Sequence, residues 1–599
     1  MSKPVSRYLL ERLCEWGTDR IFAYPGDGIN GLVAAWTEMP HAPEFIQARH
    51  EEMAAFEAVG YAKFSGNVGV CMATSGPGAI HLLNGLYDAK LDHVPVVAIV
   101  GQTNMTAMGG SYQQEVDLAS LYKDVCSNYV HVLGAPQQLP NLIDRAMRTA
   151  MSTQSPTAVI VPHDVQEAEY EPPGHAFKMV PSSLGVSWPE IRPDDKTIDR
   201  AADLLNNASK VAILVGQGAR GAAKEVEQVA EVLGAGVAKA LLGKDVIADD
   251  LSFVTGSVGL LGTRPSYELM MGCDALLTVG SNFPYTQFLP PLDQARAIQI
   301  DWDGTFIGMR YPYELNIVAD AGSALRALLP KLETKKDRSW REKIELSITH
   351  WWETVERQAM TDSDLDGVVN PQRLVWELNP RLPDNAIVTA DSGSAANWYA
   401  RHLKVNGRQR GSLSGTLATM GPGVPYAIGA KFAHPDRPAI ALVGDGAMQM
   451  NGMAELITIA RYWKEWSDPR LVVAVLHNND LNQVTWELRA MSGVKKFPDS
   501  QTIPDVDYHA FAASLGLHAN KITRAEQIGS AWDKAMAADR PTVLDVHCDP
   551  NVPPIPPHAN FKQMQDTAKA MLTGDEDAWE IFKTGTRHKV QEFVPDVKG

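Results

Sequence analysis

Cysteine is scarce in this sequence, and its few occurrences follow no pattern. Five cysteines are present among 599 residues, an odd number that contains no CxxC pair. A disulfide framework or a structural zinc site requires paired or closely spaced cysteines, so we expect neither. The scarcity favours a protein that works in the reducing cytoplasm.

Positive charge is in deficit, and long apolar runs are missing. Lysine and arginine number 54 against 71 acidic residues, which gives a net charge of −17, whereas a nucleic-acid surface needs a basic stripe. No apolar run is long enough to span a bilayer, and the first residues lack the apolar stretch of a signal peptide. The stretch 574–582 is acidic, whereas a membrane-surface helix is basic on its polar face. We therefore expect no nucleic-acid partner and no stable membrane association.

Apolar strands that end in glycine recur three times along the chain, at residues 94–101, 211–216 and 440–444. Helical periodicity fills intervening segments at 51–64, 222–233 and 454–463. Strands alternating with helices indicate α/β domains with mostly parallel sheets. Pro-rich and charged breaks divide the chain into three consecutive α/β domains, at residues 1–185, 186–345 and 346–555, followed by a C-terminal tail at 556–599.

The most informative local signal is Gly444-Asp445-Gly446, followed later by Asn478-Asn479. Each piece follows an apolar run that is typical of a buried strand. If the two strands are parallel neighbours, Asp445 and Asn479 meet at their carboxyl ends, where open α/β sheets bind ligands. One carboxylate and one amide oxygen suit a Mg²⁺ ion that shares its shell with water and phosphates. Either piece alone is ordinary turn chemistry, so the prediction depends on the pair.

This ordered pair resembles the thiamine diphosphate (ThDP) fingerprint of the pyruvate oxidase and acetohydroxyacid synthase superfamily. The chain is most similar to pyruvate oxidases and quinone-linked pyruvate dehydrogenases. The resemblance implies the ThDP-enzyme fold with ThDP and Mg²⁺ as cofactors. It assigns side-chain oxygens of Asp445 and Asn479 and the backbone carbonyl of Leu481 to the metal, and it places Gly446 and Ala447 at the cofactor. The spacer between the two halves is longer than usual, with residues 463–469 filling a surface loop.

The segment Arg49-His50-Glu51-Glu52 opens a predicted helix and resembles a signature of the same superfamily. Either glutamate could simply complement the positive helix N-terminus. The resemblance instead implies that Glu51 contacts the aminopyrimidine ring of ThDP, where a carboxylate is needed to promote proton removal from the thiazolium. Gln114 matches a position that lines the substrate pocket in relatives, although a surface polar run is an equal alternative.

A loop in the third domain, residues 414–423, resembles the family segment that packs between the two rings of ThDP. Methionine at the apolar wedge position could equally fill a gap in the core. The resemblance implies that the cofactor contacts in this loop are Ala418, Thr419 and Met420.

The middle domain is the candidate site for FAD. A GxGxxG pattern at residues 216–221 is weak evidence, because no acidic residue follows at the expected distance. Three later segments resemble the FAD-binding segments of pyruvate oxidases, and the alternative is a degenerate structural domain that binds no flavin. The implied FAD contacts are Gly259, Leu260, Leu261, Gly262, Gly280, Ser281, Asn282, Phe283, Pro284 and Asp301.

One helix departs from the pattern. Glu487 aligns with a catalytic glutamate of pyruvate oxidases, but the phenylalanine that lies between ThDP and flavin in those enzymes is absent. Either Trp486 takes its place or the electron-transfer role is lost. The alternative is that Glu487 lies on an exposed helix face and has no catalytic role.

The predicted function is ThDP- and Mg²⁺-dependent decarboxylation of pyruvate or a related 2-oxoacid, with oxidation of the resulting enamine through FAD. The alternatives are an acetolactate synthase-like carboligase with structural FAD and a catalytically silent paralogue. The resemblance also implies a homodimer or homotetramer with active sites between chains.

Overall fold

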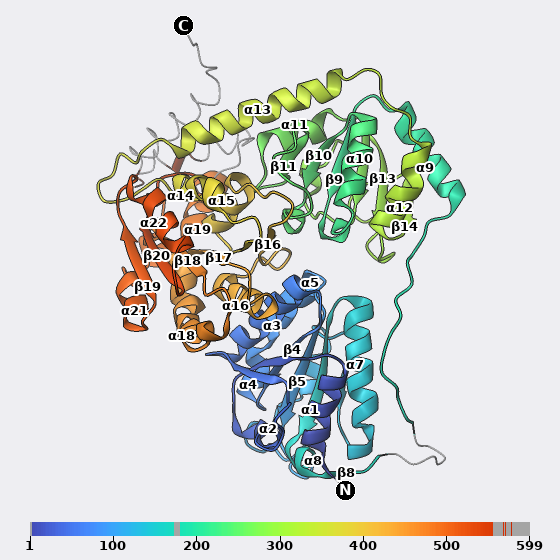
Figure 1. Ribbon diagram of the computed structural model, residues 1–599, viewed down its shortest axis with the longest axis vertical. Helices are drawn as coiled ribbons and strands as arrows, with labels where there is room; N and C mark the ends of the chain where they lie inside the picture. The colour runs from blue at the N-terminus through green and yellow to red at the C-terminus, as the bar shows by residue number, and fades with distance from the viewer. Residues whose placement is uncertain are drawn as a thin grey trace.

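The computed structural model describes residues 3–172 and 180–554, together with Thr567, Lys569, Ala570, Asp575 and Asp577. Its three α/β domains are each built on a six-stranded parallel sheet (Figure 1). The predicted fold class is therefore confirmed. The predicted tail at 556–599 lies outside the described residues, apart from the five named above.

The N-terminal sheet has the strand order β3-β2-β4-β5-β7-β6. Its central strands are buried along their whole length, which is why they are continuous apolar runs. The strands are β2 (Arg20–Ala23), β3 (Glu44–Gln47), β4 (Gly69–Ala73), β5 (Val96–Gln102), β6 (Val130–Val132) and β7 (Pro156–Pro162). The helices are α1 (Val5–Glu15), α2 (Asn30–Trp36), α3 (Glu51–Ser65), α4 (Pro77–His81), α5 (Leu83–Leu91), α6 (Leu118–Leu121), α7 (Leu139–Thr153) and α8 (His163–Glu167). A short antiparallel pair joins β1 (Lys3–Pro4) to β8 (Glu169–Tyr170).

The central sheet has the order β11-β10-β9-β12-β13-β14. Numbered from its own first strand this is 3-2-1-4-5-6, the order of doubly wound dinucleotide-binding domains. Its strands are β9 (Val211–Val215), β10 (Gly236–Lys239), β11 (Val254–Ser257), β12 (Ala275–Val279), β13 (Arg296–Asp301) and β14 (Leu315–Val318). Its helices are α9 (Asp195–Asn207), α10 (Ala223–Leu233), α11 (Arg264–Gly272), α12 (Ala321–Leu328) and α13 (Ser339–Ala359).

The C-terminal sheet has the order β16-β15-β17-β18-β20-β19. Numbered within each domain, the N- and C-terminal sheets share the order 2-1-3-4-6-5. The strands are β15 (Ile387–Ala390), β16 (Arg410–Ser412), β17 (Ala439–Gly444), β18 (Leu471–His477), β19 (His518–Ile522) and β20 (Thr542–His547). The helices are α14 (Pro371–Leu378), α15 (Ser394–His402), α16 (Gly423–Ala433), α17 (Asp445–Ala447), α18 (Met453–Tyr462), α19 (Asn482–Glu487), α20 (Pro498–Gln501), α21 (Tyr508–Ser514) and α22 (Gln527–Met536).

Helices α3 and α16 join the first domain to the third, and Figure 1 shows them side by side where the two domains meet. Glycine makes this close crossing possible. A Cβ added at Gly60 would lie 2.7 Å from the Cα of Tyr426, and one at Gly429 would lie 2.3 Å from the carbonyl oxygen of Glu57. The two helices that follow the Glu51 and cofactor-loop signatures are therefore locked together within one chain.

One predicted domain boundary falls between secondary-structure elements, and the other falls inside a helix. The boundary at 185 falls within residues 180–194, which form no helix or strand. The boundary at 345 falls inside α13, a continuous helix whose Trp340, Ile344 and Ile348 pack into the central core. The charged stretch 331–341, which favoured a linker, contains the start of this helix. We therefore place the second division after α13. In the part of the chain that the structure describes, no helix is both long and apolar enough to cross a membrane.

Candidate active site

The predicted meeting of Asp445 with the asparagine pair is present in the structure. Strands β17 and β18 are parallel neighbours, with Gly444 opposite Leu476. One carboxylate oxygen of Asp445 accepts hydrogen bonds from the backbone N–H groups of Asn478, at 2.8 Å, and Asn479, at 2.6 Å. The other accepts from the N–H of Gly446 at 2.9 Å. Asp445 is buried, and burial raises its pKa to about 6 although these N–H groups oppose the rise.

The contacts of Asp445 fit a bound metal ion. All three hydrogen-bond donors to Asp445 are neutral backbone groups, so a cation would compensate the buried charge. The side-chain oxygen of Asn479 accepts from Nε2 of His477 at 2.8 Å. That of Asn478 accepts from the N–H of Asp480 at 3.1 Å, an Asx turn that leaves its second lone pair available.

The Leu481 carbonyl, predicted as a metal ligand, accepts from the N–H groups of Val484, at 2.9 Å, and Thr485, at 3.1 Å, because Leu481 is the N-cap residue of α19. Its role at the metal stays a prediction. The side chain of Leu481 lies beside the glycine turn, since a Cβ added at Gly446 would lie 2.7 Å from Cδ2 of Leu481.

His477, which ends β18, is a site residue that the sequence did not single out. Its Nδ1 lies 2.8 Å from Asp545 and its Nε2 lies 3.1 Å from Asp505. Burial lowers the pKa of His477, but the hydrogen bond and charge of Asp545 outweigh that effect and raise it. The only sequence signal was its position directly before the asparagine pair.

The predicted cofactor loop is held by buried carboxylates. Asp391, at the end of β15, accepts from the N–H of Gly421 at 2.9 Å and of Gly423 at 2.8 Å. Burial raises the pKa of Asp391 to about 6. Ala418 has a φ of 53°, a strained left-handed conformation for a residue with a Cβ. Thr419 accepts from Asn84 of the first domain at 3.1 Å, so the loop is fixed from both sides.

Glu51 lies at the first position of α3 and is 7% exposed. Its Oε2 lies 2.9 Å from Nδ1 of His81, and the rings of His50 and His81 are 4.4 Å apart. Gly78 gives Glu51 room, because a Cβ there would lie 2.9 Å from Oε1. The side chain of Glu52 is instead 2.5 Å from Asn84. Of the two glutamates, Glu51 is therefore the buried one with histidine partners.

Gln114 belongs to the same corner as Glu51. Its φ of 62° is strained, and its side-chain oxygen accepts from Oγ of Ser75 at 2.7 Å. A Cβ added at Gly76 would lie 2.8 Å from Cβ of Gln114. The loop that contacts Gln114 continues directly to Gly78 and hence to Glu51, so the structure brings these predicted residues together.

The central domain gathers its predicted FAD residues at the point where the strand order reverses, beside the ends of β9 and β12. Gly280 has a φ of 59° and its carbonyl accepts from the N–H of Gly218 at 3.0 Å. A Cβ at Gly259, whose φ is 105°, would lie 2.9 Å from the ring of Phe283. The buried side-chain oxygen of Asn282 has no hydrogen-bond partner among the described residues. That orphaned acceptor fits a polar ligand such as a dinucleotide.

Asp301, Ser281 and Phe283 are also largely buried here. Burial raises the pKa of Asp301, and its carboxylate accepts from the N–H of Asp303 at 3.0 Å. The weak GxGxxG pattern starts against the Gly280 turn, because a Cβ at Gly216 would lie 2.3 Å from the Gly280 carbonyl, and Gln217 donates to the Asp92 carbonyl of the first domain at 2.8 Å.

The side chains of Glu487 and Trp486 leave α19 in different directions. Glu487 is exposed and accepts from Nε2 of Gln483 at 3.0 Å. Trp486 is buried, donates to the carbonyl of Pro550 at 3.1 Å, and lies beneath Arg489. It therefore packs toward the end of the chain, which argues against its replacing the missing aromatic residue.

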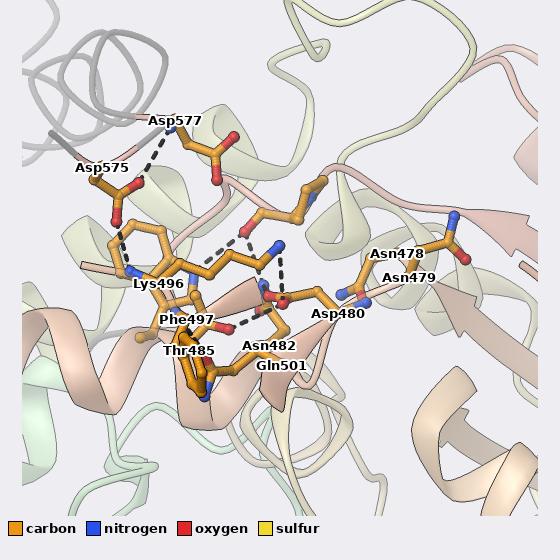
Figure 2. A network of polar contacts seen from close by, with 12 residues as sticks. Asn478, Asn479, Asp480, Asn482, Thr485, Lys496, Phe497, Gln501, Asp575 and Asp577 are labelled. Atoms are coloured by element: carbon orange, nitrogen blue, oxygen red, sulfur yellow. Dashed lines mark hydrogen bonds and ion pairs between the residues drawn. The ribbon is translucent and has the colours of Figure 1, made fainter. Parts of the chain in front are cut away.

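Polar contacts hold both ends of α19 (Figure 2). Asp480, directly before the helix, accepts from Thr485 at 2.9 Å and lies 3.2 Å from Nζ of Lys496. The π-helical turn that follows α19 carries Arg489, which donates two hydrogen bonds to Asp575 at 2.7 and 2.9 Å. Asp575 also accepts from the N–H of Lys496 at 3.0 Å.

The first and third domains share one strand order, and the domain between them in the chain has the strand order of dinucleotide-binding domains. Three family models match in that order: "Thiamine pyrophosphate enzyme, N-terminal TPP binding domain" at residues 3–121, the central domain at 198–328, and the C-terminal TPP binding domain at 391–546. The chain belongs to the thiamine pyrophosphate enzyme family, within the pyruvate oxidase and acetohydroxyacid synthase superfamily.

Curated relatives match along nearly their whole length. The chain is 35% identical over 574 residues to the Bacillus subtilis protein named "Putative thiamine pyrophosphate-containing protein YdaP", covering 95% of this chain and 96% of the relative. It is 30% identical over 533 residues to pyruvate oxidase of Lactiplantibacillus plantarum, covering 88% and 86%. It is 30% identical over 580 residues to acetolactate synthase isozyme 2 large subunit of Escherichia coli, covering 93% and 98%.

Proposed function

We propose that this protein decarboxylates pyruvate or a related 2-oxoacid with ThDP and Mg²⁺, and that FAD oxidises the product of that step. The observation that carries the proposal is the pair of buried carboxylates, Asp445 at a strand end and Glu51 at a helix start, each within a matched ThDP-type domain. When bound, the thiazolium of ThDP supplies the electron sink for decarboxylation and FAD supplies a two-electron acceptor.

In this proposal Asp445 and Asn479 hold the metal through side-chain oxygens, and Asn478 is the alternative amide ligand, because each amide oxygen accepts one hydrogen bond and keeps a second lone pair. The oxygen of Asn479 accepts from His477, whose second nitrogen is fixed by Asp545. The oxygen of Asn478 accepts one backbone hydrogen bond. Gly446 and Ala447 follow Asp445 in a short helix whose first N–H groups suit the diphosphate.

Glu51 is the proposed proton-handling group. Its carboxylate would share a proton with the aminopyrimidine ring, and His81 at 2.9 Å holds its other face in place. Ala418, Thr419 and Met420 form the wall on which the cofactor rests, with Met420 packed against the core that joins α3 and α16. Gln114 would meet the substrate.

FAD is assigned to residues 259–262 and 280–284 with Asp301, beside the orphaned Asn282 oxygen. A second function is favoured by one observation. Trp486 packs toward Pro550 and so does not favour the predicted replacement of the missing aromatic residue, which suits a carboligase of the acetolactate synthase type with structural FAD.

We also propose a homodimer or homotetramer with active sites between chains. Large apolar side chains are exposed near both candidate corners: Ile80, Tyr112 and Met450 are 44%, 61% and 54% exposed. A second copy of the chain would cover them. Mixing inactive Glu51→Gln and Asp445→Ala proteins should restore part of the activity through one hybrid site. A fully active monomer in sedimentation experiments would contradict the proposal.

The test of function is anaerobic incubation of the purified, cofactor-loaded protein with pyruvate, with product identification. Release of CO₂ and a two-carbon acid product is expected if FAD is the oxidant. Release of CO₂ with acetolactate and no acid product would favour the carboligase. No turnover with any 2-oxoacid, despite bound ThDP, would support the catalytically silent paralogue.

A further inference from the structure

Four side chains form a continuous hydrogen-bonded chain between α15 and α19. Nη2 of Arg401 donates to Oδ1 of Asn397 at 2.8 Å. Nδ2 of Asn397 donates to Oε1 of Gln483 at 2.8 Å. Nε2 of Gln483 donates to Oε1 of Glu487 at 3.0 Å. A cation therefore stands at one end of two amides and a carboxylate stands at the other.

The direction of this chain is fixed by its two ends. A guanidinium has only donors, so Asn397 must turn its oxygen toward Arg401 and its amide nitrogen toward Gln483. An ionised carboxylate has only acceptors, so Gln483 must turn its nitrogen toward Glu487. Both amide orientations follow from this requirement, and each bond polarises the next in the same sense.

The Arg401 end reaches the proposed flavin segment. Arg401 is 4% exposed, and its Nη2 also lies 3.3 Å from the carbonyl oxygen of Leu260 and 2.7 Å from that of Pro554. Leu260 is one of the residues assigned to FAD. This series of hydrogen bonds therefore connects the segment at 259–262 in the central domain with the Glu487 carboxylate on α19, the helix that follows Asn478-Asn479.

The middle of the chain is built into the protein and leaves little freedom. Asn397 is 1% exposed, and its second amide hydrogen bonds to the carbonyl of Gly393 at 3.2 Å. Gly393 has a φ of 92°, and a Cβ placed there would lie 3.9 Å from Cβ of Gln483. The glycine turn at 391–394 thus supports the amide that aims Gln483.

An exposed i,i+4 contact such as Gln483 to Glu487 contributes only a few tenths of a kcal/mol to helix stability. Helix stability alone therefore does not explain why the buried Asn397 and Arg401 continue this contact into the protein. The arrangement is explained if the position of the Glu487 carboxylate matters for the reaction.

We propose that Asn397 and Gln483 are positioning residues for Glu487, and that Arg401 ties the orientation of this carboxylate to the flavin-facing segment. The proposal rests on the proposed function, with Glu487 in the catalytic role that the resemblance to pyruvate oxidases implies. Gln483 and Asn397 link the Leu260 segment to Glu487 through oriented amides.

The decisive variant is Asn397→Asp. Its carboxylate keeps the shape of the side chain and still accepts from Arg401, but it can no longer donate to Gln483. Gln483 must then turn its nitrogen toward residue 397 and its oxygen toward Glu487, which breaks the last bond. We expect the melting temperature to fall about as far as in a matched control, because the hydrogen bond to the Gly393 carbonyl is lost as well. We expect kcat with pyruvate to fall on the order of tenfold, the scale of one hydrogen bond to a charged group. KM and FAD content should stay unchanged.

Two further variants separate positioning from stability. Asn397→Asp placed in a Glu487→Gln background should cost no additional activity, because residues that act as a unit are not additive. Asn370→Asp is the matched control, since Asn370 is 3% exposed and its amide donates only to backbone carbonyls. It should lower the melting temperature and leave kcat unchanged.

The outcomes distinguish this proposal from the function on which it rests. If the wild-type protein turns over no 2-oxoacid, the proposed function fails and the positioning role fails with it. If Glu487→Gln slows turnover but Asn397→Asp does not, the function stands and the positioning role is overturned. Additive losses in the double variant would also overturn it.

Discussion

The N- and C-terminal domains have the same strand order but place their carboxylates differently. In the C-terminal domain Asp445 follows directly from β17 and accepts three backbone N–H bonds. In the N-terminal domain Glu51 starts a helix and faces a histidine at 2.9 Å. Neutral donors around a buried carboxylate favour a cation, whereas a titratable partner favours proton transfer. One topology thus supports binding in one copy and proton chemistry in the other.

The largest effect should come from removing the C-terminal carboxylate. Asp445→Ala is expected to abolish Mg²⁺-dependent ThDP binding while the protein stays folded, because the buried anion around which the corner is arranged is lost. Calorimetric titration of ThDP at low Mg²⁺ measures this, with the exposed Asp499→Ala as control. Retained ThDP affinity would disprove the role of Asp445.

The matching change in the N-terminal domain should spare binding and slow chemistry. Glu51→Gln fills the same space but cannot share a proton as a carboxylate does. We expect near-normal ThDP affinity and exchange of the thiazolium C2 proton slower by about 10²–10⁴-fold.

NMR after acid quench follows this exchange, and Glu52→Gln is the control, since Glu52 is tied to Asn84. Unchanged exchange in Glu51→Gln, with slowing in the control, would move the role to Glu52.

The two asparagines sharpen the comparison at the metal corner. Asn479→Ala should raise the Mg²⁺ concentration needed for half-maximal ThDP binding by at least about tenfold, the scale on which even outer ligands act. Asn478→Ala should have the smaller effect, through loss of the turn with Asp480. The reverse order would make Asn478 the ligand.

A smaller effect is expected from a substitution in the central domain. Asn282→Ala removes a buried oxygen that has no described partner, so the flavin-free protein should be as stable as before or more stable. If the oxygen is satisfied by FAD, the dissociation constant for FAD should rise on the order of tenfold. Flavin fluorescence on release measures it, and an unchanged constant would exclude Asn282 from the site.

The smallest effect on turnover is expected at Asp575. Burial raises the pKa of its carboxyl, but the hydrogen bonds from Arg489 and the Lys496 N–H outweigh this and lower it. A lowered pKa in the folded state means that the contact stabilises above the ordinary carboxyl range and is lost as the pH falls through the lowered value.

Asp575→Asn should therefore speed hydrogen exchange at the Lys496 amide at neutral pH and change kcat little. Acidification through the lowered pKa of Asp575 should do the same to the wild type, relative to the intrinsic exchange rate at each pH. Exchange that is unaffected by the substitution would show that this contact does not hold the segment.

Most of the fold was predictable because buried parallel strands are continuous apolar runs that end at ligand-bearing turns. The meeting of Asp445 with residues 478–479 followed from that rule. The motif did not show that the Leu481 carbonyl also serves a helix start, because such a contact is not visible in a sequence pattern. The boundary at 345 falls inside α13 because a charged sequence is equally compatible with a solvent-facing helix.

Long-range contacts explain what the sequence could not supply. His81 lies next to Glu51 only because α3 and α4 converge, and Arg401 reaches Leu260 across a domain boundary. No spacing encodes these partners.

The most direct test of the central claim is the flavin spectrum during anaerobic mixing with pyruvate, recorded for the wild type and for FAD-loaded Asp445→Ala. If the metal corner and the central domain act in one reaction, the wild-type flavin should bleach within the turnover time and the variant flavin should stay oxidised. Rapid CO₂ release from the wild type with an unchanged flavin spectrum would contradict that claim.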